Sequence, residues 1–104
     1  GYALYGGQAF RGERAPVSTA VSLHARVLQV RDVAAGDAVG YSGAWRATRA
    51  SRVATIAAGY ADGFARMASA SNGAPGGSVN IHGARLPIVG RVSMDLVTVD
   101  VTDC

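Results

Sequence analysis

The most informative absence in this sequence is lysine. All ten basic residues of the 104-residue chain are arginines, and they stand against seven acidic residues. A lysine amine is the group that forms a Schiff base with a carbonyl substrate or with an aldehyde cofactor. This chain therefore cannot hold such a molecule covalently.

The arginines are poorly arranged for binding nucleic acid, although the formal net charge is +3. Their positions are Arg11, Arg14, Arg26, Arg31, Arg46, Arg49, Arg52, Arg66, Arg85 and Arg91. They are spread evenly along the chain, and most have no aromatic neighbour on which a base could stack. We interpret them as ordinary surface charge and expect no nucleic-acid partner.

Cysteine, charge and long apolar runs are also scarce. Cys104 is the only cysteine, and together with the distant His24 and His82 it gives neither an internal disulfide nor a metal site. No apolar run approaches the ~20 residues of a membrane span, and no signal-peptide pattern opens the chain. Hydrophobic residues make up 49% of the chain and charged residues 16%, which is typical of a folded protein. We expect one small cytoplasmic domain with a single core and no membrane partner.

Strand patterns dominate what the sequence does contain. Apolar and polar residues alternate over 16–33, and the parity slips near Val27 and Leu28, which predicts a long strand with a β-bulge. After the slip, Leu28 and Val30 are expected to take the apolar role. Further strands are predicted around Val39 and Tyr41 and over 45–49, 52–58, 78–82, 85–92 and 96–101.

Little helix is predicted. Phe64, Met67 and Ala68 fall at helical spacing, so one or two helical turns are expected after Tyr60. A glycine-rich loop at 71–77 precedes a hairpin with its turn at Gly83-Ala84, and this loop lacks the spacing of a phosphate-binding loop. The predicted fold class is all-β: a small antiparallel Greek-key-like β-barrel with a short helical turn after Tyr60.

Two compact motifs, G59-Y-A-D-G63 and V89-G-R-V-S-M-D95, each place polar residues at the end of a predicted strand. Taken alone, Tyr60 can be a packing residue, a hydrogen-bond donor or a proton-transfer group. No Ser-His-Asp order with a nucleophile elbow accompanies it, so hydrolytic catalysis has no motif support. The pairing of the two motifs is what favours a catalytic Tyr60.

These motifs, in this order, resemble the C-terminal β-domain of alanine racemase, the pyridoxal-phosphate enzyme that interconverts L- and D-alanine. The segments A3-L-Y-G6, P16-V with S22-L-H-A-R-V27, and V39-G-Y41 match the same family, so the resemblance extends over essentially the whole chain. It implies that residues 1–15 are a linker from an N-terminal (β/α)8 barrel. Residues 16–104 are then the C-terminal β-barrel domain, expected to be truncated at its C-terminus.

The resemblance also implies roles for individual residues. Tyr60 corresponds to the tyrosine that acts as one of two acid/base groups, and Met94 corresponds to the methionine whose backbone N–H contacts the substrate carboxylate. Asp95 and Asp62 are expected to line the same site. Arg66 is assigned no role, because the polarising histidine and arginine of the family come from the N-terminal barrel.

The cofactor implied by the resemblance is pyridoxal 5′-phosphate, bound covalently by a lysine of the N-terminal barrel. This chain is then expected to contribute no cofactor-binding residue and no metal ligand, and to be inactive by itself. The family's active site forms between two subunits. The expected partners are therefore the barrel of the same chain, the barrel of the second subunit in a homodimer, and a small amino-acid substrate.

The resemblance implies a racemase that supplies D-alanine for peptidoglycan. The alternative hypothesis is a noncatalytic β-barrel interaction module that binds a protein or single-stranded nucleic acid through its arginines. An upstream (β/α)8 region with a lysine near its first strand would separate the two hypotheses.

Overall fold

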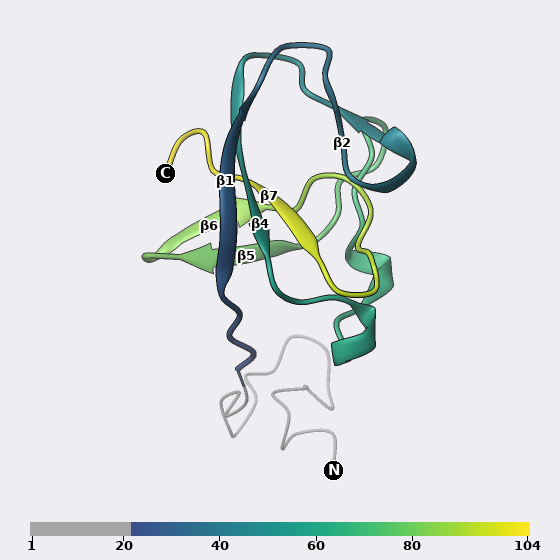
Figure 1. The fold of residues 1–104 in the computed structure, drawn as a ribbon, viewed down its shortest axis with the longest axis vertical. Coiled ribbons are helices and arrows are strands. Elements are labelled where there is room, and N and C mark those ends of the chain that lie inside the picture. Colours follow the sequence, from purple (N-terminus) through teal and green to yellow (C-terminus); the bar gives the residue numbers. More distant parts are fainter. Residues whose placement is uncertain (1–21) are drawn as a thin grey trace, which may run out of the picture.

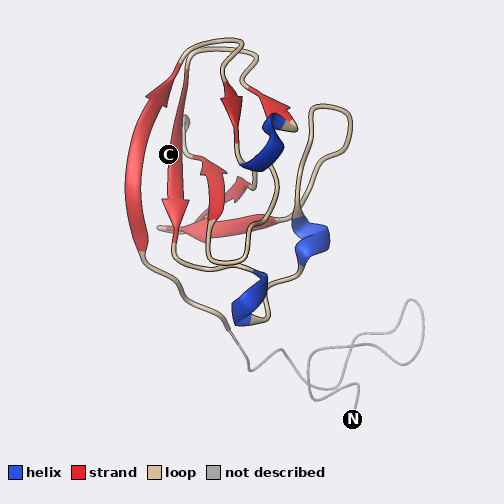
Figure 2. Cartoon of the chain, turned by 45° about the vertical axis from the view of Figure 1, so that its right-hand side comes forward, coloured by secondary structure: helices blue, strands red, loops and turns tan. Residues whose placement is uncertain are grey.

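The computed structural model describes residues 22–104. The predicted linker at 1–15, and the first part of the strand predicted over 16–33, lie outside the described residues. The described chain forms seven short strands and three single-turn 3₁₀ helices (Figures 1 and 2). The strands are β1 (Val27–Val33), β2 (Ala38–Val39), β3 (Trp45–Arg46), β4 (Ser51–Ile56), β5 (Ser78–Ile81), β6 (Ala84–Pro87) and β7 (Val97–Asp100). Every pairing between them is antiparallel, which confirms the predicted all-β class.

A three-stranded sheet in the order β1-β4-β7 forms the centre of the molecule. Its register shifts between Val27 and Gln29 of β1, which confirms the predicted bulge. The strand is shorter than predicted, because residues 22–26 are not in a strand. A bulge disrupts the ladder, and beyond it a bond from Ala57 N–H to the Arg26 carbonyl, at 2.8 Å, still joins the two segments.

β4 is buried on both faces, which explains why its sequence does not alternate cleanly. Its Ala54 and Ile56 belong to a larger core cluster, and its Val53 belongs to a smaller one. The larger cluster comprises Ala54, Ile56, Leu86, Ile88, Val92, Val97, Val99 and Val101. The smaller cluster comprises Val33, Val39, Ala47, Val53 and Val89. Two clusters, one on each side of β4, therefore replace the single core that composition suggested.

Leu28 and Val30 belong to neither cluster, contrary to the apolar role predicted for them. Their exposed fractions are 54% and 52%. The physical reason is position, because β1 is an outer strand of the β1-β4-β7 sheet, and only Val33 at its end joins a core cluster.

The β5–β6 hairpin crosses the central sheet, as Figure 1 shows in green. Its turn lies at His82 and Gly83, whose φ angles are 50° and 82°, one residue before the predicted turn. Such angles are typical of a type I′ hairpin. Beyond the hairpin, Ile88 bridges Val99 and thereby attaches it to β7. The described strands form three hydrogen-bonded sheets and not one continuous ring.

The three 3₁₀ helices are η2 (Tyr41–Gly43), η3 (Tyr60–Asp62) and η4 (Arg66–Ala68). η3 and η4 confirm the helical turns predicted near Tyr60, although η3 begins at Tyr60 itself. Phe64 and Ala68 pack against the larger cluster, whereas Met67 is 95% exposed. A single turn is too short to align all three apolar side chains on one face. No helix in the described part of the chain is long and apolar enough to cross a membrane.

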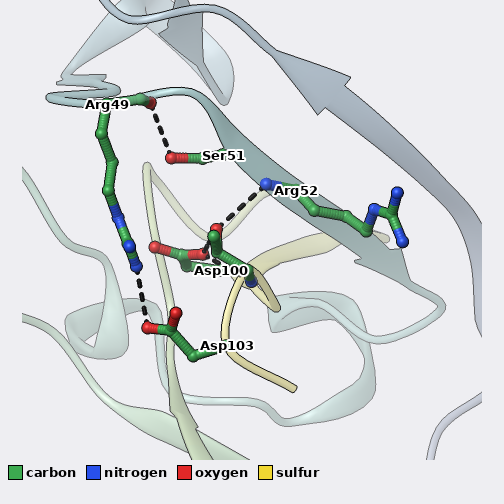
Figure 3. A network of polar contacts seen from close by, with 6 residues as sticks. Arg49, Ser51, Arg52, Asp100 and Asp103 are labelled. Atoms are coloured by element: carbon green, nitrogen blue, oxygen red, sulfur yellow. Dashed lines mark hydrogen bonds and ion pairs between the residues drawn. The ribbon is translucent and has the colours of Figure 1, made fainter.

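A polar network joins the start of β4 to the residues after β7 (Figure 3). The Arg52 N–H donates to Thr102 Oγ1 at 3.0 Å, and Thr102 in turn donates to Asp100. Arg49 pairs with Asp103 at 2.8 Å, and the hydrogen bond and charge of Asp103 raise the pKa of Arg49 above its ordinary value. The partners are exposed, so this pair contributes little to stability. The candidate site follows the other end of β4.

Candidate active site

Tyr60 lies where the chain leaves the end of β4 and turns through η3. The turn is fixed by two bonds: Asp62 Oδ2 accepts from the Gly59 N–H at 3.0 Å, and the Gly63 N–H donates to the Tyr60 carbonyl at 3.2 Å. Gly63 has a φ of 87°, which a glycine adopts without the strain that a side chain would cause. The Tyr60 side chain is 41% exposed. These bonds fix the backbone at Tyr60, while the phenol stays accessible.

The two motifs singled out in the sequence lie against each other. The Tyr60 N–H donates to the Ser93 carbonyl, and the Ala61 N–H donates to the Met94 carbonyl, each at 3.0 Å. Gly59 permits this contact, because a Cβ there would lie 2.3 Å from the Met94 carbonyl oxygen. The structure thus brings Tyr60 and Met94, predicted separately, to one place.

Met94 sits in a tight turn between Ser93 and Leu96. Ser93 and Leu96 close the turn, with Ser93 Oγ both accepting from the Leu96 N–H and donating to its carbonyl at 3.0 Å. The Met94 side chain is 53% exposed. Among the described residues, no acceptor is bonded to the Met94 N–H, so this donor is free to bind a ligand.

A cavity of about 610 Å³ lies beside Tyr60 and Met94. Its lining residues are Tyr60, Arg66, Ser69, Arg91, Val92, Ser93 and Met94. Two of them are arginines and none is acidic, so the cavity has positive character. A concave site with a few converging polar groups is typical of small-molecule binding. The charge here suits a ligand that carries a carboxylate or phosphate.

Asp62 and Asp95, predicted as site-lining residues, are close to this cavity in sequence but are not among the residues that line it. Asp62 instead accepts the Gly59 N–H and so shapes the turn that carries Tyr60. Asp95 is exposed. Their predicted roles at the site stay predictions.

The histidines lie apart from this cavity. His24 makes a 2.9 Å hydrogen bond with Ser22, and His82 occupies the β5–β6 turn. Over residues 22–104, no group of three His, Cys, Asp or Glu side chains is placed to hold a metal ion.

Among the lining residues, sequence reasoning assigned no site role to Arg66, Ser69, Arg91, Val92 and Ser93. The Arg66 guanidinium carbon lies 5.4 Å from the centroid of the Tyr60 ring. Ser69 Oγ accepts from the Val92 N–H at 2.8 Å and donates to the Arg66 carbonyl at 2.7 Å. The position of Arg91 inside the second motif was a usable signal. Nothing in the local sequence marked Ser69.

Comparison with known proteins gives the family. The family model described as alanine racemase, C-terminal domain, matches residues 20–104. The catabolic alanine racemase of Rhizobium johnstonii is 54% identical over 98% of this chain, and the alanine racemase of Acidiphilium cryptum is 50% identical over 99% of it. The chain belongs to the alanine racemase family. The match corresponds to the C-terminal domain of that family and favours the racemase hypothesis over an interaction module.

Solved structures of alanine racemases share the fold. The biosynthetic alanine racemase of Pseudomonas aeruginosa superposes with a TM-score of 0.83 at 38% identity, covering 97% of this chain and 28% of that one. The alanine racemase of Bartonella henselae, with covalently bound pyridoxal phosphate, gives a TM-score of 0.67 at 47% identity, over 74% of this chain and 20% of that one. The chain spans only 26% and 28% of the two curated relatives.

Proposed function

We propose that this chain is the part of an alanine racemase that supplies Tyr60 as one of the two acid/base groups interconverting L- and D-alanine. The observation that carries the proposal is the meeting of Tyr60 with the Met94 turn at one positively charged cavity. Neither motif is sufficient alone. Together they provide a proton-transfer group and a carboxylate-binding donor in one place.

Racemisation needs a base on one face of Cα and an acid on the opposite face. A half-exposed phenol at the edge of a cavity can approach one face, and it can hold or deliver the proton through its Oη. The second group is proposed to be a lysine outside this chain, which itself contains none. Tyr60 is proposed to serve the L-alanine face, so it removes the proton in the L-to-D direction and returns it in the other.

The remaining groups of the cavity suit the substrate carboxylate. The free Met94 N–H is a neutral donor, which explains why an apolar methionine stands at a polar site. Arg91 adds positive charge to the cavity lining, which contains no carboxylate to neutralise it. We propose that Met94 N–H orients the carboxylate of the small amino-acid substrate, with Asp95 in the same region.

Pyridoxal 5′-phosphate can contact this chain without being covalently bound to it. No residue here can hold it covalently, since lysine is absent, whereas the open, cationic cavity can form one side of its site. When bound, the cofactor supplies an electron sink for the electron pair left when the Cα proton is removed.

The domain arrangement follows from this division of groups. We propose that residues 1–15 lead in from an N-terminal (β/α)8 barrel that carries the lysine, and that 16–104 form the β-domain. The barrel that receives Tyr60 is proposed to belong to the second subunit of a homodimer. The assembled enzyme is proposed to supply D-alanine for peptidoglycan in the cytoplasm.

The test is Tyr60→Phe in the full-length enzyme. The variant removes only the hydroxyl, so cofactor absorbance should stay near that of the wild type while racemisation falls by roughly 100-fold or more. Exchange of the Cα proton for deuterium, measured separately from L- and D-alanine, should be lost preferentially from L-alanine.

Met67→Leu is the control, because Met67 is almost fully exposed and does not line the cavity. It should racemise at the wild-type rate. Wild-type turnover by Tyr60→Phe would disprove the proposed role of Tyr60.

A further inference from the structure

We propose that Arg66 is a positioning residue for Tyr60, holding the phenol ring in the orientation needed for proton transfer. This inference rests on the proposed function of Tyr60. The Arg66 guanidinium carbon lies 5.4 Å from the centroid of the Tyr60 ring, within the range over which a cation is attracted to an aromatic face. Both side chains line the same cavity.

The charge of Arg66 is available for this contact. The ion pairs within residues 22–104 are Arg49 with Asp103 and Arg52 with Asp32, so no carboxylate in that range pairs with Arg66. A guanidinium shared with a carboxylate would be less attracted to the ring.

The Tyr60 ring needs such a contact. Its backbone is fixed by bonds to the Ser93 carbonyl and from the Gly63 N–H, but within residues 22–104 its hydroxyl makes no hydrogen bond. The side chain is 41% exposed and can rotate about two torsions. Proton transfer depends strongly on the alignment of the transferring group with the reacting atom. The contact with the Arg66 guanidinium restricts rotation of the Tyr60 ring about these torsions.

Arg66 is itself held from two sides. Ser69 donates to the Arg66 carbonyl through both its N–H, at 3.2 Å, and its Oγ, at 2.7 Å. Ser69 Oγ also accepts from the Val92 N–H at 2.8 Å, and Ala70 N–H donates to the Gly90 carbonyl at 2.8 Å. These hydrogen bonds join η4 to the segment that leads into Met94. They therefore fix the backbone from which the Arg66 side chain extends.

The kinetic test compares Arg66→Met, Arg66→Lys and Arg85→Met in the full-length enzyme. Methionine retains an apolar stem without the charge, so kcat should fall roughly three- to tenfold with KM changed less than twofold. Lysine restores the charge over the ring and should recover most of that loss. Arg85 is an exposed arginine of β6 outside the cavity, and its substitution should leave both constants unchanged.

A double substitution separates positioning of Tyr60 from a general effect of charge in the cavity. If Arg66 acts through Tyr60, adding Arg66→Met to Tyr60→Phe should leave the residual rate of Tyr60→Phe within about twofold. An additional loss equal to that in the wild-type background would overturn the inference.

A spectroscopic test needs no cofactor and no turnover. NMR of selectively labelled arginine in the full-length apoenzyme should show the side-chain protons of Arg66 shifted upfield by the ring current of Tyr60. Tyr60→Phe should keep the shift, because the ring remains, and Tyr60→Leu should abolish it. The same spectrum in Tyr60→Leu and wild type would overturn the inference.

The failures are distinguishable. If Tyr60→Phe is inactive while Arg66→Met retains the wild-type kcat, only the role of Arg66 is wrong. If Tyr60→Phe is fully active, the proposed function of Tyr60 fails, and this inference fails with it.

Discussion

Gly59 shows how much of the site depends on one missing side chain. Its φ of −160° is extended backbone that any residue adopts, so conformation does not require glycine here. Glycine is required by the lack of space, because a Cβ would lie 2.3 Å from the Met94 carbonyl oxygen and 2.4 Å from that of Ser93. The two neighbours are backbone atoms, and they cannot move without separating Tyr60 from the Met94 turn.

Substitution Gly59→Ala is therefore expected to destabilise the fold by about 1–3 kcal/mol, as overpacking of a close contact does. Chemical denaturation of the full-length protein measures this free energy. Gly73→Ala is the matched control, since a Cβ at Gly73 meets nothing within 4 Å and its φ is not in the left-handed region. Equal stability of the two variants would contradict the close contact at Gly59.

At the scale of elements, the site is assembled from three segments, two of which lie between β4 and β5 and one between β6 and β7. The turn after β4 carries Tyr60, η4 carries Arg66, and the segment before β7 carries Met94. Ser69 connects the second and third of these, because its Oγ bonds both the Arg66 carbonyl and the Val92 N–H. The Ser69 hydroxyl therefore helps to hold two segments of the site together, although Ser69 itself lies in a loop.

Replacement Ser69→Ala should cost about 1–3 kcal/mol of stability, because the N–H of the buried Val92 loses its acceptor. It should also reduce kcat, since η4 and the Met94 segment lose a shared bond. Thermal unfolding and steady-state kinetics measure the two effects. In the comparison variant Ser71→Ala, the hydroxyl removed makes no hydrogen bond among the described residues, and we expect little change. A Ser69→Ala enzyme as stable as Ser71→Ala would show that Val92 finds another acceptor.

At the scale of the whole molecule, the exposure of the site to solvent indicates how the site is completed. Tyr60, Met94 and Leu96 are all at least 40% exposed, and the cavity between the first two opens on the surface. An apolar and cationic region of this kind suits a second protein surface. This agrees with the proposal that the barrel of another subunit completes the site.

Hybrid dimers test that arrangement. One subunit carries Tyr60→Phe, the other lacks the Schiff-base lysine of its barrel, and differently tagged subunits allow the hybrid to be purified. If Tyr60 acts on the partner's cofactor, one of the two sites is intact, and the hybrid should show about half of the wild-type activity. Each parental homodimer should show only residual activity. An inactive hybrid would mean that both groups act within one subunit.

The sequence predicted the kinds of elements better than their extents. Apolar patterns located most of the strands, and the parity slip located the bulge between Val27 and Gln29. The apolar role of Leu28 and Val30 was wrong, because the pattern of one strand does not show which strands lie beside it. The number of core clusters was missed for the same reason, since both clusters pack on a single strand, β4.

By itself, the sequence determined that no cofactor can be attached to this chain through lysine, that the fold is built from antiparallel strands, and that two motifs belong to the alanine racemase family. Only the tertiary structure decided that Tyr60, Arg66 and Met94 share one cavity. Local sequence determines which strands and turns the backbone prefers. The cavity depends instead on hydrogen bonds between segments far apart in the chain. Those bonds form where the central sheet places the end of β4 beside the start of β7.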